Sequence, residues 1–149
     1  VGDLVLKNVA RRMRSTIRET DTVARVGGDE FVIIQAEIES AEDADVLARR
    51  IVASVSGACF GDDEAVSVGA SIGIALAPWD GNSPDELLRK ADQALYRSKA
   101  GGGGAINFFS SCLNSEAHDE LQSQHSLNAS QPQDLFWETV TALPRSENA

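Results

Sequence analysis

The chain has 149 residues, 42 % of them hydrophobic and 24 % charged, a composition that fits one globular domain with a modest core. Its 13 basic and 23 acidic side chains give a formal net charge of −10, which argues against nucleic acid as a partner because phosphate backbones would repel the chain. No apolar run approaches the roughly 18 residues of a membrane span, and no basic-then-apolar leader stands at the start, so we expect no membrane segment here and a cytoplasmic location, with an anchor upstream of Val1 left open.

The charge is unevenly distributed along the chain. Residues 1–109 carry 12 basic and 17 acidic groups, whereas residues 110–149 carry 1 and 6. Any anionic small ligand is therefore expected to bind within 1–109. The two cysteines, Cys59 and Cys112, lie far apart without metal-ligand spacing, which favours free thiols in a reducing compartment over a disulfide or a zinc site.

The first expected elements are a helix and a hairpin. Apolar residues recur at three- and four-residue spacing from Leu4 to Arg18, which predicts an amphipathic helix with Asp3 as its N-cap or first-turn acid. The β-branched and aromatic runs 22–26 and 31–36 predict two strands. The segment Gly27-Gly28-Asp29-Glu30 between them predicts a hairpin with a four-residue connection.

Two more helices are expected, at 40–57 and 83–99. Two more strands are expected, at 65–77 and 106–109. Ser40 and Ser83 are each followed by acidic residues, which is typical of a helix start because serine caps the first turn and the helix dipole favours acids there. Pro78 ends the longer strand. The order of elements in 1–109 indicates a mixed α+β class with an antiparallel part.

Residues 110–149 differ from the rest of the chain. They are rich in Ser, Asn, Gln and acidic side chains and lack periodicity, which predicts an acidic linker or a disordered tail. Leu135-Phe136-Trp137 is an apolar patch in this segment and a candidate for docking on another surface.

The hairpin tip Gly27-Gly28-Asp29-Glu30 carries the chemistry that the residues suggest. Glycines allow the backbone to approach phosphates because no Cβ stands in the way. Neighbouring carboxylates can hold hard Mg²⁺ ions, and carboxylate-bound metals suit in-line attack on a nucleotide phosphate. A solvated turn explains the same residues equally well, so the tip alone leaves both interpretations open.

Two blocks of sequence together resemble the GGDEF family of diguanylate cyclase domains. The first is Arg25-Val26-Gly27-Gly28-Asp29-Glu30-Phe31, which resembles the motif that names the family. The second runs from Ser71-Ile72-Gly73-Ile74-Ala75 through Pro78-Trp79-Asp80-Gly81 to the stretch 87–99, and it resembles the family's C-terminal half. The resemblance covers residues 1–109. It implies a fold like that of adenylyl cyclase catalytic cores, a ferredoxin-like derived sheet wrapped by helices, with the first strand and helix missing.

The resemblance also implies an activity. Two such domains meet as a homodimer, each holding one GTP and two Mg²⁺ or Mn²⁺ ions, and they join the two GTP molecules into cyclic di-GMP with release of pyrophosphate. By this likeness Gly27 and Gly28 line the GTP phosphates, Asp29 binds metal, and Glu30 assists the attacking 3′-hydroxyl or binds a second metal.

Two more residues match functional positions of the family. Asp3 matches the acid that reads the guanine edge, and Lys99 matches a lysine that contacts the phosphates. Each has a plainer explanation, because an acid stabilises the start of a helix and a lysine stabilises its end.

Arg18-Glu19-Thr20-Asp21 lies before Gly27 at the spacing of the family's RxxD product-inhibition site. Arginine offers a planar fork to phosphate and guanine, and aspartate accepts from guanine N–H groups. An exposed ion pair of little energetic value would explain the same residues, but at this spacing we favour the inhibitory site. Arg49, or its neighbour Arg50, is expected to add a further arginine from the next helix, and the sequence does not choose between the two.

The chain departs from the family pattern in three places. Family members carry a strand and a helix before the Gly2-Asp3 pair, which supply a metal-binding Asp and a guanine-reading Asn. Without them, residues 1–149 alone are expected to be inactive and marginally folded, with an open sheet edge. Gly103 stands where the family usually has a phosphate-contacting Arg, which predicts weaker GTP binding, and Val26 replaces a common Tyr.

Three functions fit these observations. A diguanylate cyclase module of a larger signalling protein is favoured, because Asp29 and Glu30 are intact. A catalytically silent module that binds cyclic di-GMP through Arg18 and Asp21 is the main alternative, and Gly103 points mildly towards it. A third is a GTP-binding regulatory domain beside a phosphodiesterase, because residues 110–121 look like the linker that leads from GGDEF to EAL domains.

Overall fold

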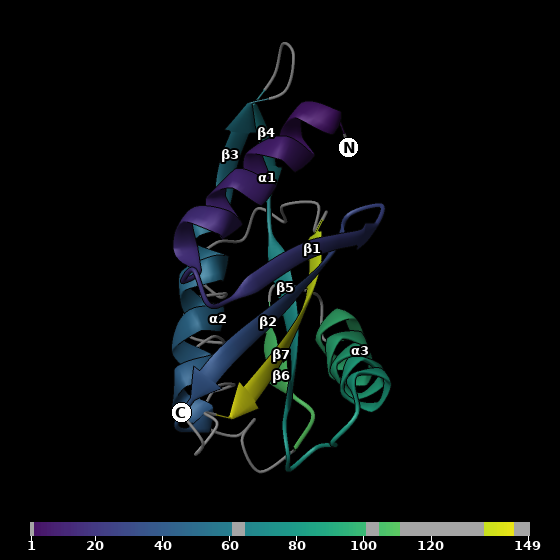
Figure 1. Ribbon diagram of the computed structural model, residues 1–149. Coiled ribbons are helices and arrows are strands. Elements are labelled where there is room, and N and C mark those ends of the chain that lie inside the picture. The colour runs from purple at the N-terminus through teal and green to yellow at the C-terminus, as the bar shows by residue number, and fades with distance from the viewer. Residues whose placement is uncertain (1, 61–64, 101–104, 111–135, 145–149) are drawn as a thin grey trace.

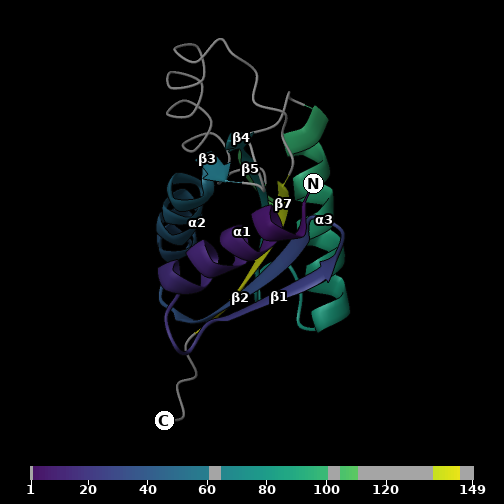
Figure 2. The same ribbon diagram turned by 90° about the horizontal axis from the view of Figure 1, so that it is seen from above.

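The computed structural model describes residues 2–60, 65–100, 105–110 and 136–144. Its architecture is a central sheet between two layers of helices (Figure 1). Helices α1 (Asp3–Thr16) and α2 (Ala41–Val55) cover one face of the sheet, and α3 (Pro84–Ala100) covers the other (Figure 2). The predicted mixed α+β class is thereby confirmed.

The main sheet has five strands in the order β1-β2-β7-β5-β6. Their bounds are Thr22–Gly27 for β1, Glu30–Ile38 for β2, Ala70–Leu76 for β5, Ile106–Phe108 for β6 and Phe136–Pro144 for β7. Strands β1 and β2 are antiparallel, whereas β7 runs parallel to both of its neighbours and β6 runs parallel to β5. A separate antiparallel pair, β3 (Gly57–Phe60) and β4 (Ala65–Val68), projects beyond one end of the main sheet (Figure 1).

Strand β7 occupies the centre of the sheet although it comes from the end of the described chain. In register, Trp137 pairs with both Glu30 of β2 and Ser71 of β5. This differs from the linker or disordered tail expected for 110–149, and it fills the sheet where an open edge was expected. Residues 136–144 are rich in the aromatic and β-branched types that suit a strand with partners on both sides. Residues 111–135 and 145–149 lie outside the described residues.

The other elements follow the expected order with shifted ends. Helix α1 ends at Thr16 rather than Arg18, and the hairpin connection is shortened to Gly28 and Asp29 because the strands continue further into the tip. The long strand expected at 65–77 is divided into β4 and β5. Strand β3 begins directly after α2 and was not expected.

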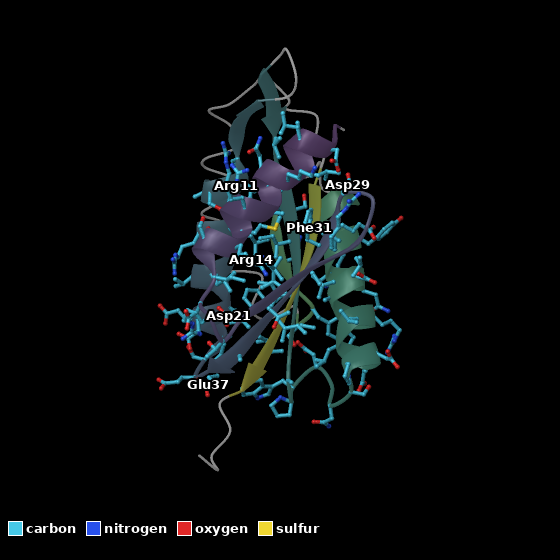
Figure 3. All side chains as sticks on the ribbon, turned by 45° about the horizontal axis from the view of Figure 1, so that its top comes forward. Arg11, Arg14, Asp21, Asp29, Phe31 and Glu37 are labelled. Carbon is cyan, nitrogen blue, oxygen red and sulfur yellow. The ribbon has the colours of Figure 1, made fainter. Side chains whose placement is uncertain are left out.

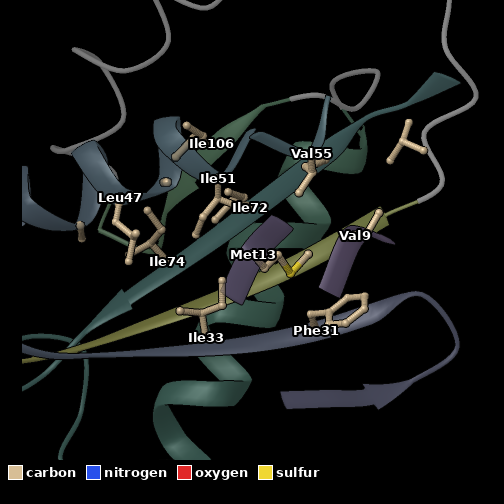
Figure 4. Packing of buried hydrophobic residues seen from close by; sticks show 14 of the residues in the cluster. Val9, Met13, Phe31, Ile33, Leu47, Ile51, Val55, Ile72, Ile74 and Ile106 are labelled. Carbon is tan, nitrogen blue, oxygen red and sulfur yellow. The ribbon is translucent and has the colours of Figure 1, made fainter. Parts of the chain in front are cut away.

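One hydrophobic core lies between the sheet and the helices α1 and α2. Its α1 side chains recur at helical spacing, so they meet the inward-facing residues of β2 across one layer. Figure 4 shows Met13 of α1 against Phe31 and Ile33 of β2, with Ile51 of α2 and Ile72 of β5 further along. The α1 residues in this core are Val5, Leu6, Val9 and Met13.

Helix α3 packs against β5 on the opposite face. A Cβ added at Gly73 would collide with the carbonyl oxygen of Ala91 and lie 2.5 Å from the backbone nitrogen of Leu95. Only glycine therefore lets the helix backbone approach the strand this closely. Across the described ranges, no helix combines the length and the hydrophobicity needed to cross a membrane.

Candidate active site

The site expected from the sequence lies at the tip of the β1–β2 hairpin. Gly27 ends β1 and Glu30 begins β2, so the turn itself consists of Gly28 and Asp29. Gly28 has φ +50°, a left-handed conformation that glycine adopts at little steric cost. A Cβ added at Gly27 or Gly28 would meet nothing within 4 Å, so the backbone here is open to an approaching ligand.

The two acidic side chains of the tip are accessible. Asp29 is partly buried and Glu30 is exposed. Among the described residues, neither carboxylate makes a hydrogen bond or an ion pair. Both are therefore available as oxygen donors to a ligand that arrives at the tip.

One side chain reaches across the tip. The Nε of Arg25 donates a hydrogen bond of 2.7 Å to the carbonyl oxygen of Gly28. The sequence places Arg25 within the motif but predicts no role for it. The signal was present in its position three residues before Gly28, a spacing at which an arginine on one strand can reach the turn that follows.

A groove of about 500 Å³ runs between α1 and β1, beside the tip. Its floor is apolar and its rim is basic, which suits a ligand with a flat apolar part and anionic groups. The floor is made by Leu6, Ala10, Val23 and Phe31, and the rim by Lys7, Arg11, Arg14 and Arg25. Of the residues that the structure describes, Asp3 is the one acid that lines it. Figure 3 shows Arg11, Arg14 and Phe31 on this side of the molecule.

Asp3 lies in the first turn of α1, as expected, and its carboxylate is exposed. The Nζ of Lys7 lies 2.8 Å from its Oδ2. The hydrogen bond and positive charge of Lys7 hold the pKa of the Asp3 carboxyl below its usual 3.8, with a smaller contribution from the charge of Arg25. Asp3 is thus kept ionised next to the tip, in the form that accepts hydrogen bonds from N–H donors.

The expected RxxD pair lies at the other end of the hairpin. Figure 3 shows Asp21 far from Asp29, near Glu37. Asp21 is only 8 % exposed, and its two oxygens accept hydrogen bonds from the backbone N–H groups of Arg18 (3.0 Å) and Ala36 (3.1 Å). The Nε of Arg18 lies 3.7 Å from the same carboxylate. Asp21 therefore ties the start of β1 to β2, a structural role that the sequence did not reveal.

A pocket of about 480 Å³ opens beside Arg18 and Asp21. It is lined by two guanidinium groups, Arg18 and Arg50, and by four carboxylates, Asp21, Glu37, Glu39 and Asp43. The amide oxygen of Gln35, also in its wall, is buried and has no hydrogen-bond partner among the described residues. The acidic surplus opposes the binding of an anion here.

The two neighbouring arginines of α2 differ in their surroundings. The Nε of Arg49 lies 2.7 Å from Asp45 Oδ2, one turn earlier on the same helix. Arg50 donates to the carbonyl oxygen of Thr16 at 3.2 Å and lines the pocket with Arg18. The geometry thus favours Arg50 over Arg49 as a partner of Arg18.

Lys99 lies in the last turn of α3, and its side chain is outside the described part of the structure. Within the described ranges, no group of three or more His, Cys, Asp or Glu is arranged to hold a metal ion. Asp29 and Glu30 nevertheless fit Mg²⁺, which is commonly held by one or two carboxylates together with substrate phosphates. The tip thus offers donors of the right chemistry from two adjacent residues.

Comparisons with known proteins agree with the motifs. Residues 1–105 match the family model described as diguanylate cyclase, GGDEF domain. The chain is 42 % identical over 127 residues to the bifunctional diguanylate cyclase/cyclic di-GMP phosphodiesterase MucR of Pseudomonas aeruginosa, covering 85 % of this chain and 18 % of MucR. It is 43 % identical over 105 residues to the diguanylate cyclase TpbB of the same species, covering 70 % of this chain and 24 % of TpbB.

A solved structure shares the fold. The crystal structure of the GGDEF domain of TpbB (YfiN) from Pseudomonas aeruginosa superposes with a TM-score of 0.62 at 34 % sequence identity, covering 71 % of this chain and 66 % of that one. The chain spans about a fifth of the length of MucR and about a quarter of that of TpbB. The family match, the relatives and the shared fold together show that the chain belongs to the GGDEF domain family.

Proposed function

We propose that the chain is the catalytic module of a diguanylate cyclase, which condenses two GTP molecules into cyclic di-GMP. In this reaction the 3′-hydroxyl of each GTP attacks the α-phosphate of the other, so that two phosphodiester bonds form and two pyrophosphates leave. The observation that carries the proposal is the hairpin tip. Its two carboxylates, Asp29 and Glu30, have no partner in the described part of the chain, and the glycines before them leave open space for phosphates.

The residues of the hairpin tip and Asp3 have roles that their surroundings support, whereas the role of Lys99 rests on the sequence alone. Gly27 and Gly28 line the phosphates, since nothing occupies the space where a Cβ would point. Asp29 holds metal, and Glu30 accepts the proton of the attacking hydroxyl or holds a second metal. Asp3, kept ionised by Lys7, accepts from the N–H groups of the guanine edge. Lys99 adds a cation for the phosphates from the end of α3.

A divalent metal, Mg²⁺ or Mn²⁺ with two ions per GTP, would supply electrostatic stabilisation of the charge that develops on the transferred phosphate. Asp29 and Glu30 are the residues of this chain that would hold it. The remaining contributions come from the protein itself, because the groove between α1 and β1 orients the nucleotide and its basic rim attracts the anion.

Catalysis by this scheme needs two domains, because each holds one GTP and the product joins both. We therefore propose a homodimer with the two tips facing each other. The exposed position of the tip at the end of the hairpin is compatible with such an approach (Figure 1).

The RxxD pair remains a proposal for product inhibition, with Arg50 in place of Arg49 as the third residue. Arg18 and Arg50 line one pocket and supply two guanidinium groups. Four carboxylates in the same wall predict that cyclic di-GMP binds there weakly. A titration of the protein with cyclic di-GMP, compared with an Arg18→Ala, Arg50→Ala variant, tests this.

The test of the proposed function is the double variant Asp29→Ala, Glu30→Ala in the protein that carries this chain. With GTP and Mg²⁺, the unchanged protein should form cyclic di-GMP and the variant should lose synthesis by about a thousandfold or more, as when charge-stabilising groups of an active site are removed. Equal synthesis by both proteins would overturn the proposal. Loss of synthesis with retained binding of cyclic di-GMP would separate the tip from the RxxD pocket.

The catalytically silent sensor is the second candidate. It is supported by the absence of an arginine at position 103, where Gly103 stands, and it is opposed by the acidic surplus around Arg18 and Arg50. Tight binding of cyclic di-GMP without any synthesis by the unchanged protein would favour it.

A further inference from the structure

The hairpin tip is poorly fixed by its own strand pairing. In the β1–β2 register Arg25 faces Phe31 and Gly27 faces Glu30, so Val26 is an extra residue that forms a bulge. Val26 is 62 % exposed and therefore adds little packing. The turn beyond the bulge contains a glycine, whose backbone is free to visit many conformations. The carboxylates of Asp29 and Glu30 thus lie on a segment that needs another restraint to keep one geometry.

Arg25 provides that restraint. Its Nε donates to the carbonyl oxygen of Gly28 at 2.7 Å, a short distance for a charged donor. Arg25 precedes the bulge at Val26, and its hydrogen-bond acceptor Gly28 follows it, so the bond spans the irregular part of the hairpin. The main chain of Arg25 is held in place by its cross-strand partner Phe31, which is 3 % exposed and packs in the core.

The bond contributes little to the stability of the fold, because Arg25 is exposed and water competes for both partners. The bond matters more for the geometry of the turn than for the free energy of unfolding. Arg25 also lines the groove that Asp3 and Lys7 line. Arg25 therefore touches the turn and the groove at the same time.

We infer that Arg25 is a positioning residue, which holds the Gly28-Asp29 turn so that Asp29 and Glu30 keep the geometry needed for a metal–phosphate ligand. The inference rests on the proposed function for that ligand, but the ordering of the turn can be measured without it. Only arginine combines an Nε donor with terminal N–H groups in one planar fork. A lysine at this position could reach the carbonyl with a flexible ammonium, and would order the turn less well.

The first experiment measures the turn itself, in the 149-residue chain without metal or nucleotide. Backbone ¹⁵N heteronuclear NOE values of residues 27–30 are compared in the unchanged protein and in Arg25→Gln, Arg25→Lys and Arg89→Gln variants. Arg89 is an exposed arginine of α3 and serves as the matched control. We expect the NOE values at the tip to fall in Arg25→Gln, to fall less in Arg25→Lys and to stay unchanged in Arg89→Gln. Unchanged values in Arg25→Gln would overturn the inference.

The second experiment links the turn to the ligand, in the protein that carries this chain. Binding of Mn²⁺ in the presence of GTP, followed by the electron paramagnetic resonance signal of free Mn²⁺, should weaken about tenfold in Arg25→Gln, the effect of one lost charge-assisted hydrogen bond. Cyclic di-GMP synthesis should fall with it and recover in part at high metal concentration. A rise in the KM for GTP without any loss of Mn²⁺ affinity would show that Arg25 acts only as part of the basic rim of the groove, and that result would also overturn the inference.

Asp29→Ala separates the two proposals. It should abolish Mn²⁺ binding while leaving the NOE values of the other tip residues unchanged. If the unchanged protein neither binds Mn²⁺ nor makes cyclic di-GMP, the proposed function fails. A fall in the NOE values of the tip in Arg25→Gln would still show that Arg25 orders the turn.

Discussion

The two ends of the β1–β2 hairpin use the same kind of side chain for opposite purposes. At the base, Asp21 is buried and each of its oxygens accepts a backbone N–H, from Arg18 and from Ala36. At the tip, Asp29 and Glu30 make no such bond among the described residues. A buried carboxylate must be hydrogen-bonded to be tolerated, and once bonded it stabilises the fold. A carboxylate left unengaged on an exposed turn contributes nothing to stability and is available to a ligand.

The largest effect is expected beneath the tip, where Phe31 belongs to the core although it is the last residue of the motif Arg25–Phe31. Phe31→Ala should destabilise the domain by about 4 kcal/mol, the usual cost of emptying a buried aromatic site. Chemical denaturation followed by circular dichroism measures this. A loss below about 1 kcal/mol would show that Phe31 does not contribute to the stability of the core, although it is buried there.

Asp21→Ala tests the base of the hairpin directly. The change leaves the N–H groups of Arg18 and Ala36 without their acceptor and should cost about 3 kcal/mol in the free energy of unfolding. Asp29→Ala is the matched control at the other end and should change stability by no more than about 0.5 kcal/mol. If the two substitutions destabilise the chain equally, the contrast between base and tip is wrong.

Gly28→Ala is expected to have a moderate effect, confined to the turn. A β-carbon there meets no atom, so the cost comes from the left-handed backbone at φ +50° and should be about 1 kcal/mol. Gly27→Ala is the control, because Gly27 also has open space but no positive φ. Thermal melts of the two variants should differ, and identical melting temperatures would contradict the role of the Gly28 conformation.

The smallest effect concerns the pKa of Asp3 beside the tip. Lys7 lowers it, so this carboxylate favours the folded state above about pH 3.8, its usual pKa, and that contribution is lost as the pH falls through the lowered value. Lys7→Met should raise the pKa of Asp3 towards 3.8, as measured by NMR titration of its carboxyl carbon. Glu86, whose pKa is lowered by Lys90 on α3, serves as the reference, because Lys7→Met should leave the pKa of Glu86 unchanged.

Local patterns predicted most of the fold around this hairpin. The three- and four-residue spacing from Leu4 onwards predicted α1, and Ser40 and Ser83 marked the starts of α2 and α3 within one residue. These signals depend on neighbours in sequence, which is why they can be read without a structure. Strand β7 could not be predicted in the same way, because its place is set by pairing with β2 and β5, which lie far away in the chain.

The site was predictable in its residue types and less so in its contacts. The motif drew attention to Asp29 and Glu30 because two adjacent acids after two glycines are chemically conspicuous. It gave no role to Arg25, whose bond to Gly28 depends on the bulge and on the direction of one side chain. The sequence also does not show that the oxygens of Asp21 accept hydrogen bonds within the fold, since one of the donors, the N–H of Ala36, lies on the opposite strand.

The central position of β7 has a consequence for how the domain assembles. Its partners around residues 30 and 70 are synthesised long before residues 136–144 leave the ribosome. Contacts between such distant parts of a chain form late and slow folding, because a long loop must close first. Until β7 arrives, β2 and β5 each present an unpaired edge that could associate with another nascent chain. The strand that completes the middle of this sheet is therefore the last of its strands to be made.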